Sequence, residues 1–128
     1  MLLENDKTML IFGFDKEEAQ TIHDLLRKNN LAAHKVKVVE ESMGKMKIKD
    51  ILNGLKIGIY NCRLPKEKFI LLNNFNDGEL DKIIKDLRSN LMSKPILAVV
   101  TETSIEWTFE SLLEHLVEER EWFKNHRK

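Results

Sequence analysis

The sequence has few of the residues that build several familiar kinds of site. It holds one cysteine, Cys62, which excludes an internal disulfide and a metal site made of several cysteines. Its five glycines form no phosphate-binding loop, since Gly13 stands alone between two phenylalanines. No apolar run approaches the length of a membrane-spanning helix, and the first residues lack the basic and apolar regions of a secretion signal. We therefore expect a cytoplasmic protein.

The chain also lacks a net charge. Its 21 basic residues offset its 21 acidic residues, so no global field favours nucleic acid or an anionic membrane. The only basic cluster lies between Lys35 and Lys49, with lysines at positions 45, 47 and 49. A phosphate backbone could bind Lys45, Lys47 and Lys49. We favour a simpler interpretation, in which these lysines protect an edge strand and a helix start, because no aromatic residues interleave with them for base stacking.

No group of catalytic or metal-ligating residues stands out. The four histidines, at positions 23, 34, 115 and 126, do not share a ligand spacing such as two residues four apart on one helix face. His23 aligns with the edge of an apolar stripe, which favours a half-buried packing role. Cys62 lies beside Arg63, but a lone thiol without a paired histidine is usually incidental. We therefore expect no metal and no cofactor.

The most informative pattern is an internal repeat. A shift of 61 positions lays residues 10–52 over residues 71–113 without a gap, and 11 of the 43 aligned pairs are identical. Composition alone would give roughly three identical pairs. We interpret the two segments as copies of one structural unit, the first covering about residues 8–54 and the second about residues 69–126.

Both copies begin with the same signals. A short apolar run, 9–12 in the first copy and 69–72 in the second, predicts a buried strand. Asp15 and Asn76 follow at equivalent positions and are typical helix N-caps, each with a glutamate three residues later that completes a capping box. Each copy therefore starts with a strand and a helix.

A second strand follows in each copy, and the two differ in character. Residues 96–100 are apolar throughout, which predicts a central strand. Residues 35–39 contain lysines that alternate with valines, which predicts a half-exposed strand.

The stretch Lys45–Lys49 also alternates, as a strand would. The repeat resolves this ambiguity, because the stretch aligns with Glu106–Glu110, which leads into a clear helical pattern of apolar residues. We therefore predict a helix here that ends near Gly54. Residues 55–68 then link the two copies, and Lys56–Tyr60 within this link leave an extra edge strand open.

These elements predict one α/β domain, 1–128, in which two gapless βαβα repeats share a four-stranded sheet, because neither copy can cover its apolar face alone. Two arrangements remain open. In a pseudo-twofold, ferredoxin-like arrangement the central strands meet antiparallel and the sheet is mixed, whereas in a tandem arrangement the sheet is parallel. We slightly prefer the pseudo-twofold arrangement, because a duplicated unit descends most easily from a symmetric dimer.

The second copy also resembles a known family. The residues that carry the resemblance are Phe75, Glu79 and Leu80, then the run Lys94–Thr101, then Trp107, Thr108, Leu112 and Leu113. This order resembles a small bacterial family known only as a domain of unknown function, over roughly the C-terminal half of the chain. The resemblance implies a fold. It implies no activity, because the family has none that is established.

Ligands of α/β proteins tend to bind just beyond the carboxyl ends of strands. The candidate residues at such positions are Asn74, Thr101, Glu102, Thr103 and Trp107. Their hydroxyl, carboxylate and indole groups could hydrogen-bond and stack on a small polar ligand. The alternative is structural. Asn74, which is equivalent to Gly13, adopts a positive φ. Thr103 or Thr108 then caps a helix, Trp107 staples it, and Glu102 is solvated.

The last helix extends beyond its counterpart in the first copy. Its predicted apolar stripe runs from Phe109 to Phe123 and leaves Trp122 on the opposite side. Trp122 then either packs on a neighbouring helix of the same chain or anchors a second copy in a homodimer. Both alternatives remain open.

The sequence as a whole favours a noncatalytic module that binds a small ligand or a protein at the carboxyl ends of its strands. One alternative is a small enzyme that uses Glu102 in the same crevice as an acid or base. The other is a protein that binds nucleic acid through Lys45, Lys47 and Lys49.

Overall fold

The computed structural model describes residues 7–28, 35–54, 64–91 and 94–126. The chain forms two compact units, and each unit draws on both halves of the sequence. We call them the sheet unit (residues 1–38 and 67–100) and the helical unit (residues 39–66 and 101–128). The expectation of a single domain with a link at 55–68 stays a prediction.

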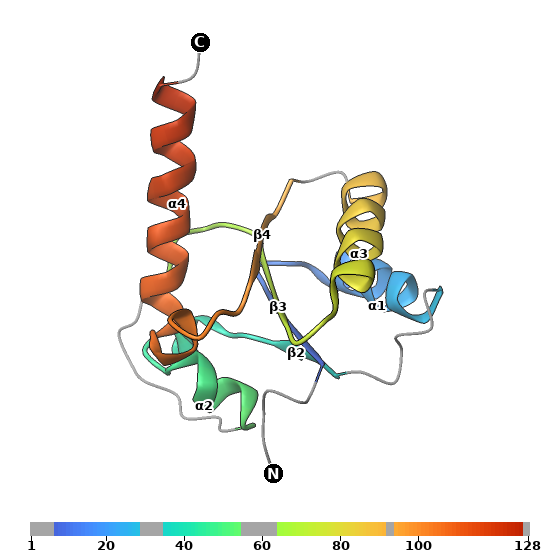
Figure 1. The fold of residues 1–128 in the computed structure, drawn as a ribbon, viewed down its shortest axis with the longest axis horizontal. Coiled ribbons are helices and arrows are strands. Elements are labelled where there is room, and N and C mark those ends of the chain that lie inside the picture. Colours follow the sequence, from blue (N-terminus) through green and yellow to red (C-terminus); the bar gives the residue numbers. More distant parts are fainter. Residues whose placement is uncertain (1–6, 29–34, 55–63, 92–93, 127–128) are drawn as a thin grey trace. The chain divides into compact units, whose positions relative to one another are not determined.

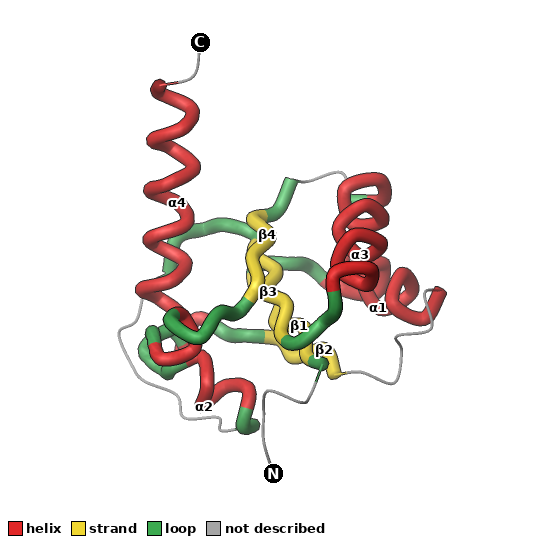
Figure 2. Tube along the Cα trace, viewed as in Figure 1, coloured by secondary structure: helices red, strands yellow, loops and turns green. Residues whose placement is uncertain are grey.

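The sheet unit contains one open, mixed sheet of four strands. In chain order its elements are β1 (Thr8–Phe12), α1 (Lys16–Lys28), β2 (Lys35–Val38), β3 (Phe69–Asn73), α3 (Asp77–Asn90) and β4 (Ile96–Val99). The strand order is β2-β1-β3-β4 (Figures 1 and 2). β1 pairs antiparallel with β3, and each central strand pairs parallel with its own edge strand. The predicted α/β class and the preferred pseudo-twofold arrangement are therefore confirmed, and the parallel tandem sheet is excluded.

The register of the central strands follows the repeat. Leu10 on β1 lies opposite Leu71 on β3, which is the residue 61 positions later, and both side chains are buried. On either side of this pair, Met9 lies opposite Leu72 and Ile11 opposite Ile70. Met9 is the repeat equivalent of Ile70, and Ile11 is the repeat equivalent of Leu72. The two flanking pairs are therefore related by the repeat. A local twofold axis therefore passes through the Leu10–Leu71 pair.

The predicted helix starts are present in both copies. Asp15 accepts a hydrogen bond from the Glu18 N–H at 2.8 Å. Asn76 accepts from the Glu79 N–H at 2.8 Å, and Glu79 Oε1 accepts from the Asn76 N–H at 3.0 Å, so the second copy has a complete capping box. These caps fix where α1 and α3 begin.

The helices α1 and α3 lie side by side against one face of the sheet (Figure 1). They bury a single apolar cluster, because each carries one stripe of large aliphatic residues at helical spacing. Its buried members are Met9, Ile11, Ile22, Leu26, Ile70, Leu72, Phe75, Ile83, Leu87 and Leu91.

The position of β4 differs from the sequence-based prediction. Its apolar run predicted a central strand, but β4 is an edge strand, and its Val99 side chain is 42% exposed. Residues 96–98 are only partly buried. An uninterrupted apolar run indicates that both faces of a strand are partly covered, and it does not indicate how many neighbouring strands there are.

The helical unit repeats the same local symmetry without a sheet. Its elements are η2 (Glu41–Met43), α2 (Ile48–Leu52), η3 (Ser104–Glu106) and α4 (Phe109–His126). Lys47 and Thr108, which are 61 positions apart, form an isolated antiparallel bridge. The Ile48 N–H donates to the Trp107 carbonyl at 2.9 Å, and the equivalent Phe109 N–H donates to the Met46 carbonyl at 2.9 Å.

The second helix of the first copy is confirmed. The lysine-rich stretch that could have been a strand leads into α2, and Gly54 follows it with a positive φ of 87°. Lys56–Tyr60, where an extra edge strand was left open, lie outside the described residues, as do Cys62 and His34.

Candidate functional site

The turn after β4 holds three of the predicted site residues and is held together by its own hydroxyl groups. The Thr101 N–H donates to Ser104 Oγ at 2.9 Å, and the Ser104 N–H donates to Thr101 Oγ1 at 3.0 Å. The two hydroxyl groups also lie 3.1 Å apart. This reciprocal arrangement starts η3 as a capping box starts a helix. Ser104 is 6% exposed, so its hydroxyl is committed to the turn.

Glu102 and Thr103 are exposed on the same turn. The side chain of Thr103 makes no capping hydrogen bond to η3, although capping was the structural role considered for it. A general acid or base works best where burial or a neighbouring charge tunes its pKa. The exposure of Glu102 therefore counts against an enzyme that uses this carboxylate.

Trp107 ends η3 and is partly buried. Its ring meets the ring of His115 edge to face, with centroids 5.5 Å apart and an interplanar angle of 87°. Its carbonyl oxygen accepts the Ile48 N–H described above. Thr108 follows as the predicted cap of α4, because its Oγ1 accepts the Ser111 N–H at 3.1 Å.

Asn74 lies in the sheet unit, directly after β3. Its φ is 67°, and that of Gly13, its repeat equivalent, is 85°. Both residues therefore adopt the left-handed conformation that the repeat predicted for this turn. The other candidates, Thr101 to Thr103 and Trp107, belong to the helical unit. A shared ligand site for Asn74 and these residues stays a prediction.

The basic cluster contacts glutamates of the second copy. Lys45 Nζ lies 2.5 Å from Glu110 Oε1, and Lys49 Nζ lies 3.0 Å from Glu106 Oε1. Lys47 Nζ is 3.9 Å from the same Glu106 oxygen. These glutamates offset the positive charge that a phosphate backbone would need. The arrangement therefore weakens the nucleic-acid alternative.

The end of α4 carries the most exposed aromatic side chains among the described residues. Trp122 is 55% exposed and Phe123 is 60% exposed. The rings of Trp122 and His126 stack with centroids 4.2 Å apart, and Trp122 meets Phe123 edge to face at 5.2 Å. We call Trp122, Phe123 and His126 the α4 aromatic cluster. The two partners in these ring contacts, Phe123 and His126, lie on the same helix as Trp122.

Two predictions about exposure are wrong. Phe123 was placed in the buried stripe of α4, but burial ends earlier: Phe109, Leu112 and Leu113 are buried, and Phe123 is exposed. The helical spacing continues beyond the residues that the helix packs on, and spacing alone does not show where packing stops. His23 is also exposed rather than half-buried, because it lies just beyond the edge of the α1 stripe.

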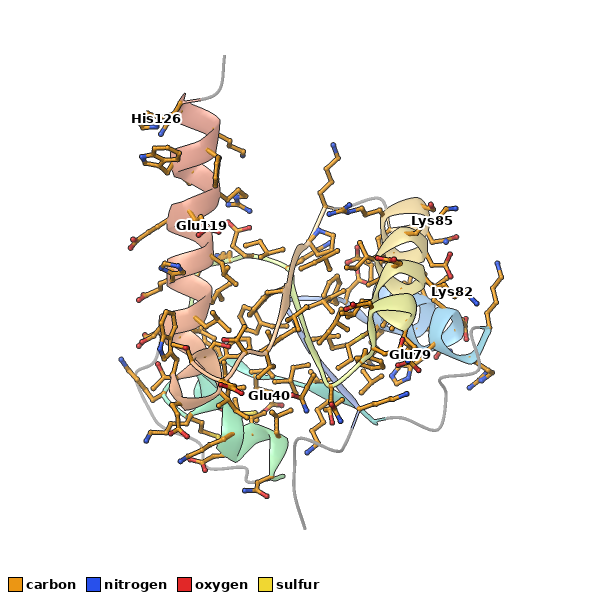
Figure 3. The ribbon with its side chains drawn as sticks, viewed as in Figure 1. Glu40, Glu79, Lys82, Lys85, Glu119 and His126 are labelled. Carbon is orange, nitrogen blue, oxygen red and sulfur yellow. The ribbon has the colours of Figure 1, made fainter. Side chains whose placement is uncertain are left out.

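Three residues of interest were missed from the sequence. Ser104 had a signal, because it lies three residues after Thr101 just before a turn. His126 lies one helical turn after Trp122 and Glu119 lies one turn before it, and these spacings place the three residues on one face of α4. Figure 3 labels Glu119 and His126 along this helix. The histidine was considered only as a metal ligand, so its stacking on Trp122 was overlooked.

No metal-binding group of three or more His, Cys, Asp or Glu side chains occurs in the part of the chain that the structure describes. The apolar space between α1 and α3, lined by Met9, Ile22 and Leu87 among others, has no room for a water molecule. None of the helices within the described ranges is long and apolar enough to cross a membrane.

Residues 68–123 match the family model described as a domain of unknown function, DUF3783. The matched segment begins just before β3 and ends near the end of α4, so it covers nearly all of the second copy and none of the first. The resemblance of the C-terminal half to an uncharacterised domain family is confirmed. No curated protein and no solved structure matches the chain.

Proposed function

We propose that this chain is a noncatalytic protein-binding module of the bacterial cytoplasm that pairs with a second copy of itself through the end of α4. The observation that carries the proposal is the exposure of the α4 aromatic cluster. Tryptophan and other aromatic residues are enriched at the centres of protein interfaces, where they contribute much of the binding energy. A tryptophan and a phenylalanine side by side in solvent leave a large apolar area uncovered.

The polar residues beside the α4 aromatic cluster favour a second molecule of this protein as the partner. Glu119, Trp122 and His126 lie on one face of α4, at spacings of three and four residues. If two α4 helices pair antiparallel about the cluster, Glu119 of each copy lies against His126 of the other. A twofold axis produces this contact twice. The face would then place an imidazole against a carboxylate on each side of a shared apolar centre.

The other candidate surfaces support the proposal by being occupied or isolated. The Thr101 and Ser104 hydroxyl groups bond to each other, which leaves the turn after β4 with fewer groups for a small ligand. Glu102 lies in solvent. The lysine cluster contacts glutamates. None of these surfaces exposes two neighbouring aromatic side chains as the end of α4 does.

Sedimentation or native mass spectrometry of Trp122→Ala tests the proposal. Truncation of a central tryptophan costs about 2 kcal/mol or more at an interface, so we expect the dissociation constant for pairing through α4 to rise roughly 30-fold. The monomer should keep its thermal stability, because the side chain is exposed. Lys124→Ala is the matched control, since Lys124 is exposed on the same helical turn but points away from the Trp122 face. A wild-type protein that stays monomeric at high concentration contradicts the proposal.

A charge exchange tests the antiparallel geometry within the same proposal. Glu119→Lys should weaken the dimer, and Glu119→Lys combined with His126→Glu should restore it. Residues 119 and 126 are separated by about 10 Å along the helix axis, so they cannot pair within one copy. Restoration by the double variant therefore reports a contact between copies, and its absence rules out this register.

We also propose that the two halves arose by duplication of one βαβα unit. The identical residues of the repeat support this history. So does the pairing of repeat equivalents, Leu10 with Leu71 in the sheet unit and Lys47 with Thr108 in the helical unit. A symmetric homodimer of single copies would have such contacts on its twofold axis.

A further inference from the structure

The two edge strands of the sheet are repeat equivalents but differ in protection. β2 carries Lys37 at the position equivalent to Ala98, whereas β4 (Ile96–Val99) carries only apolar residues. Proteins commonly place lysines on edge strands to prevent pairing with another chain. Among the described residues, no strand pairs with β4 on the side away from β3. Of the two edges, only β4 is suited to accept another strand.

The hydrogen bonds of β4 show which backbone groups face outward. The Ile96 N–H donates to the Lys68 carbonyl at 2.8 Å, and the Val100 N–H donates to the Leu72 carbonyl at 2.9 Å. Backbone groups alternate in direction along a strand. The N–H and C=O groups of Leu97 and Val99 therefore point away from β3, toward the open edge.

The open segment is bounded at both ends. Pro95 precedes β4 and has no N–H to donate. After β4, the Thr101 N–H already donates to Ser104 Oγ. Leu97 and Val99 are thus the two residues of this edge that offer both an N–H and a C=O to a new strand. This short template is symmetric about Ala98.

We propose that β4 pairs antiparallel with β4 of a second molecule of this protein. The pairing is centred on Ala98 and joins the two four-stranded sheets into one continuous sheet. In this register Leu97 of each copy lies opposite Val99 of the other, and the outward N–H and C=O groups of both residues are satisfied. The twofold axis of this pairing passes between the two Ala98 residues. They face each other without backbone hydrogen bonds, and at such pairs the Cα atoms lie about 4.5 Å apart. The small side chain of Ala98 suits this close approach.

The ends of the segment favour a second copy over an unrelated strand. Lys94 precedes the apolar run and Glu102 follows it, each separated from Ala98 by the same number of residues in the sequence. Antiparallel pairing therefore directs the lysine end of each copy toward the glutamate end of the other. The surface shares no residue with the α4 aromatic cluster, so it is a second interface, and its existence does not depend on the proposed role of α4.

Disulfide trapping tests this register in the full-length chain. With Cys62→Ser to remove the native thiol, Ala98→Cys should form a covalent dimer of doubled mass under mild oxidation. The distance at the axis lies within the range that a disulfide spans. The matched control is Lys37→Cys, at the equivalent position of β2, which should stay monomeric on a non-reducing gel. Equal trapping of both variants, or none of Ala98→Cys, overturns the proposal.

A second pair of variants tests the edge without cysteine. Val99 and Val38 are repeat equivalents, and both are exposed, by 42% and 60%. Val99→Lys gives β4 the protection that β2 has, and should lower the yield of Ala98→Cys crosslinking about tenfold, which corresponds to 1.4 kcal/mol. Val38→Lys should leave the yield unchanged. If both lysines lower it equally, the effect is one of general charge and the β4 pairing is excluded.

Discussion

The turn after the first strand of each copy contains a different residue, Gly13 in the first copy and Asn74 in the second. The φ of Gly13 is 85°, and a Cβ atom at this position would lie 2.3 Å from the Glu67 carbonyl oxygen. Asn74, the equivalent residue, adopts nearly the same φ with a full side chain. The close approach of Glu67 therefore restricts Gly13 in a way that the turn conformation alone does not.

We predict that Gly13→Ala lowers the free energy of unfolding by about 2 kcal/mol or more. A left-handed conformation costs an alanine about 1 kcal/mol, and the contact with the Glu67 carbonyl adds a clash with backbone that cannot rotate away. Asn74→Gly is the matched control and should change stability by less than about 1 kcal/mol, because glycine adopts this φ readily. Urea denaturation measures both. Equal effects at the two positions would show that the Glu67 contact is unimportant.

At the scale of an element, η3 depends on a reciprocal pair of hydroxyl groups. Ser104→Ala removes the acceptor of the Thr101 N–H and leaves that donor without its partner, which costs roughly 1–2 kcal/mol in comparable caps. Thr103→Ala, on the same turn, should cost less than about 0.5 kcal/mol, since Thr103 is exposed and its side chain makes no capping hydrogen bond to η3. Thermal unfolding followed by circular dichroism distinguishes the two. If Thr103→Ala is the more damaging, the cap has been assigned to the wrong residue.

The elements themselves were largely predictable because the repeat supplied two versions of each signal. The strands, the helix starts at Asp15 and Asn76, and the helix after Lys47 all follow from local patterns. Two features did not follow. The edge position of β4 depends on which strands pair over long range, and the exposure of Phe123 depends on where packing stops. Neither is encoded by the spacing of apolar residues in one segment.

The role of the candidate site follows less directly from the sequence, for a related reason. A threonine or a glutamate after a strand has the same appearance in the sequence whether it binds a ligand or its own backbone. The Thr101 hydroxyl accepts a hydrogen bond from the Ser104 N–H. This contact depends on the fold of the turn and is not visible in the sequence. For Trp122 the sequence left two alternatives open, packing on a neighbouring helix of the same chain and anchoring a homodimer, and its exposure fits the second.

At the scale of the whole molecule, the two copies are complementary and not merely similar. In the helical unit the first copy supplies lysines and the second supplies glutamates, in the pairs Lys45–Glu110 and Lys49–Glu106. In the sheet unit, β1 and β3 pair Phe12 with Phe69. Two identical copies could make none of these contacts. If the proposed duplication occurred, these substitutions came to favour the pairing of one copy with the other over pairing with itself.

This complementarity predicts the behaviour of the second copy alone, as residues 67–128. Self-pairing of β3 about Leu71 would set Phe69 against Asn73, and the equivalent contact near Thr108 would set Glu106 against Glu110. The fragment should therefore show no cooperative unfolding at any practical concentration.

Asn73→Phe combined with Glu106→Lys should reverse this result in the fragment, because each change replaces a mismatch with the contact seen in the full chain. A fragment with both changes, studied with Trp122→Ala to remove association through α4, should fold in a concentration-dependent way, as circular dichroism and sedimentation can show. In the full-length chain the same Glu106→Lys should instead destabilise, since the new lysine faces Lys49, 3.0 Å from the oxygen it replaces. A wild-type fragment that folds as a monomer would contradict this prediction, because one copy would then be stable alone. The lysine–glutamate pairs between the two copies would not be explained by a need of each copy for the other.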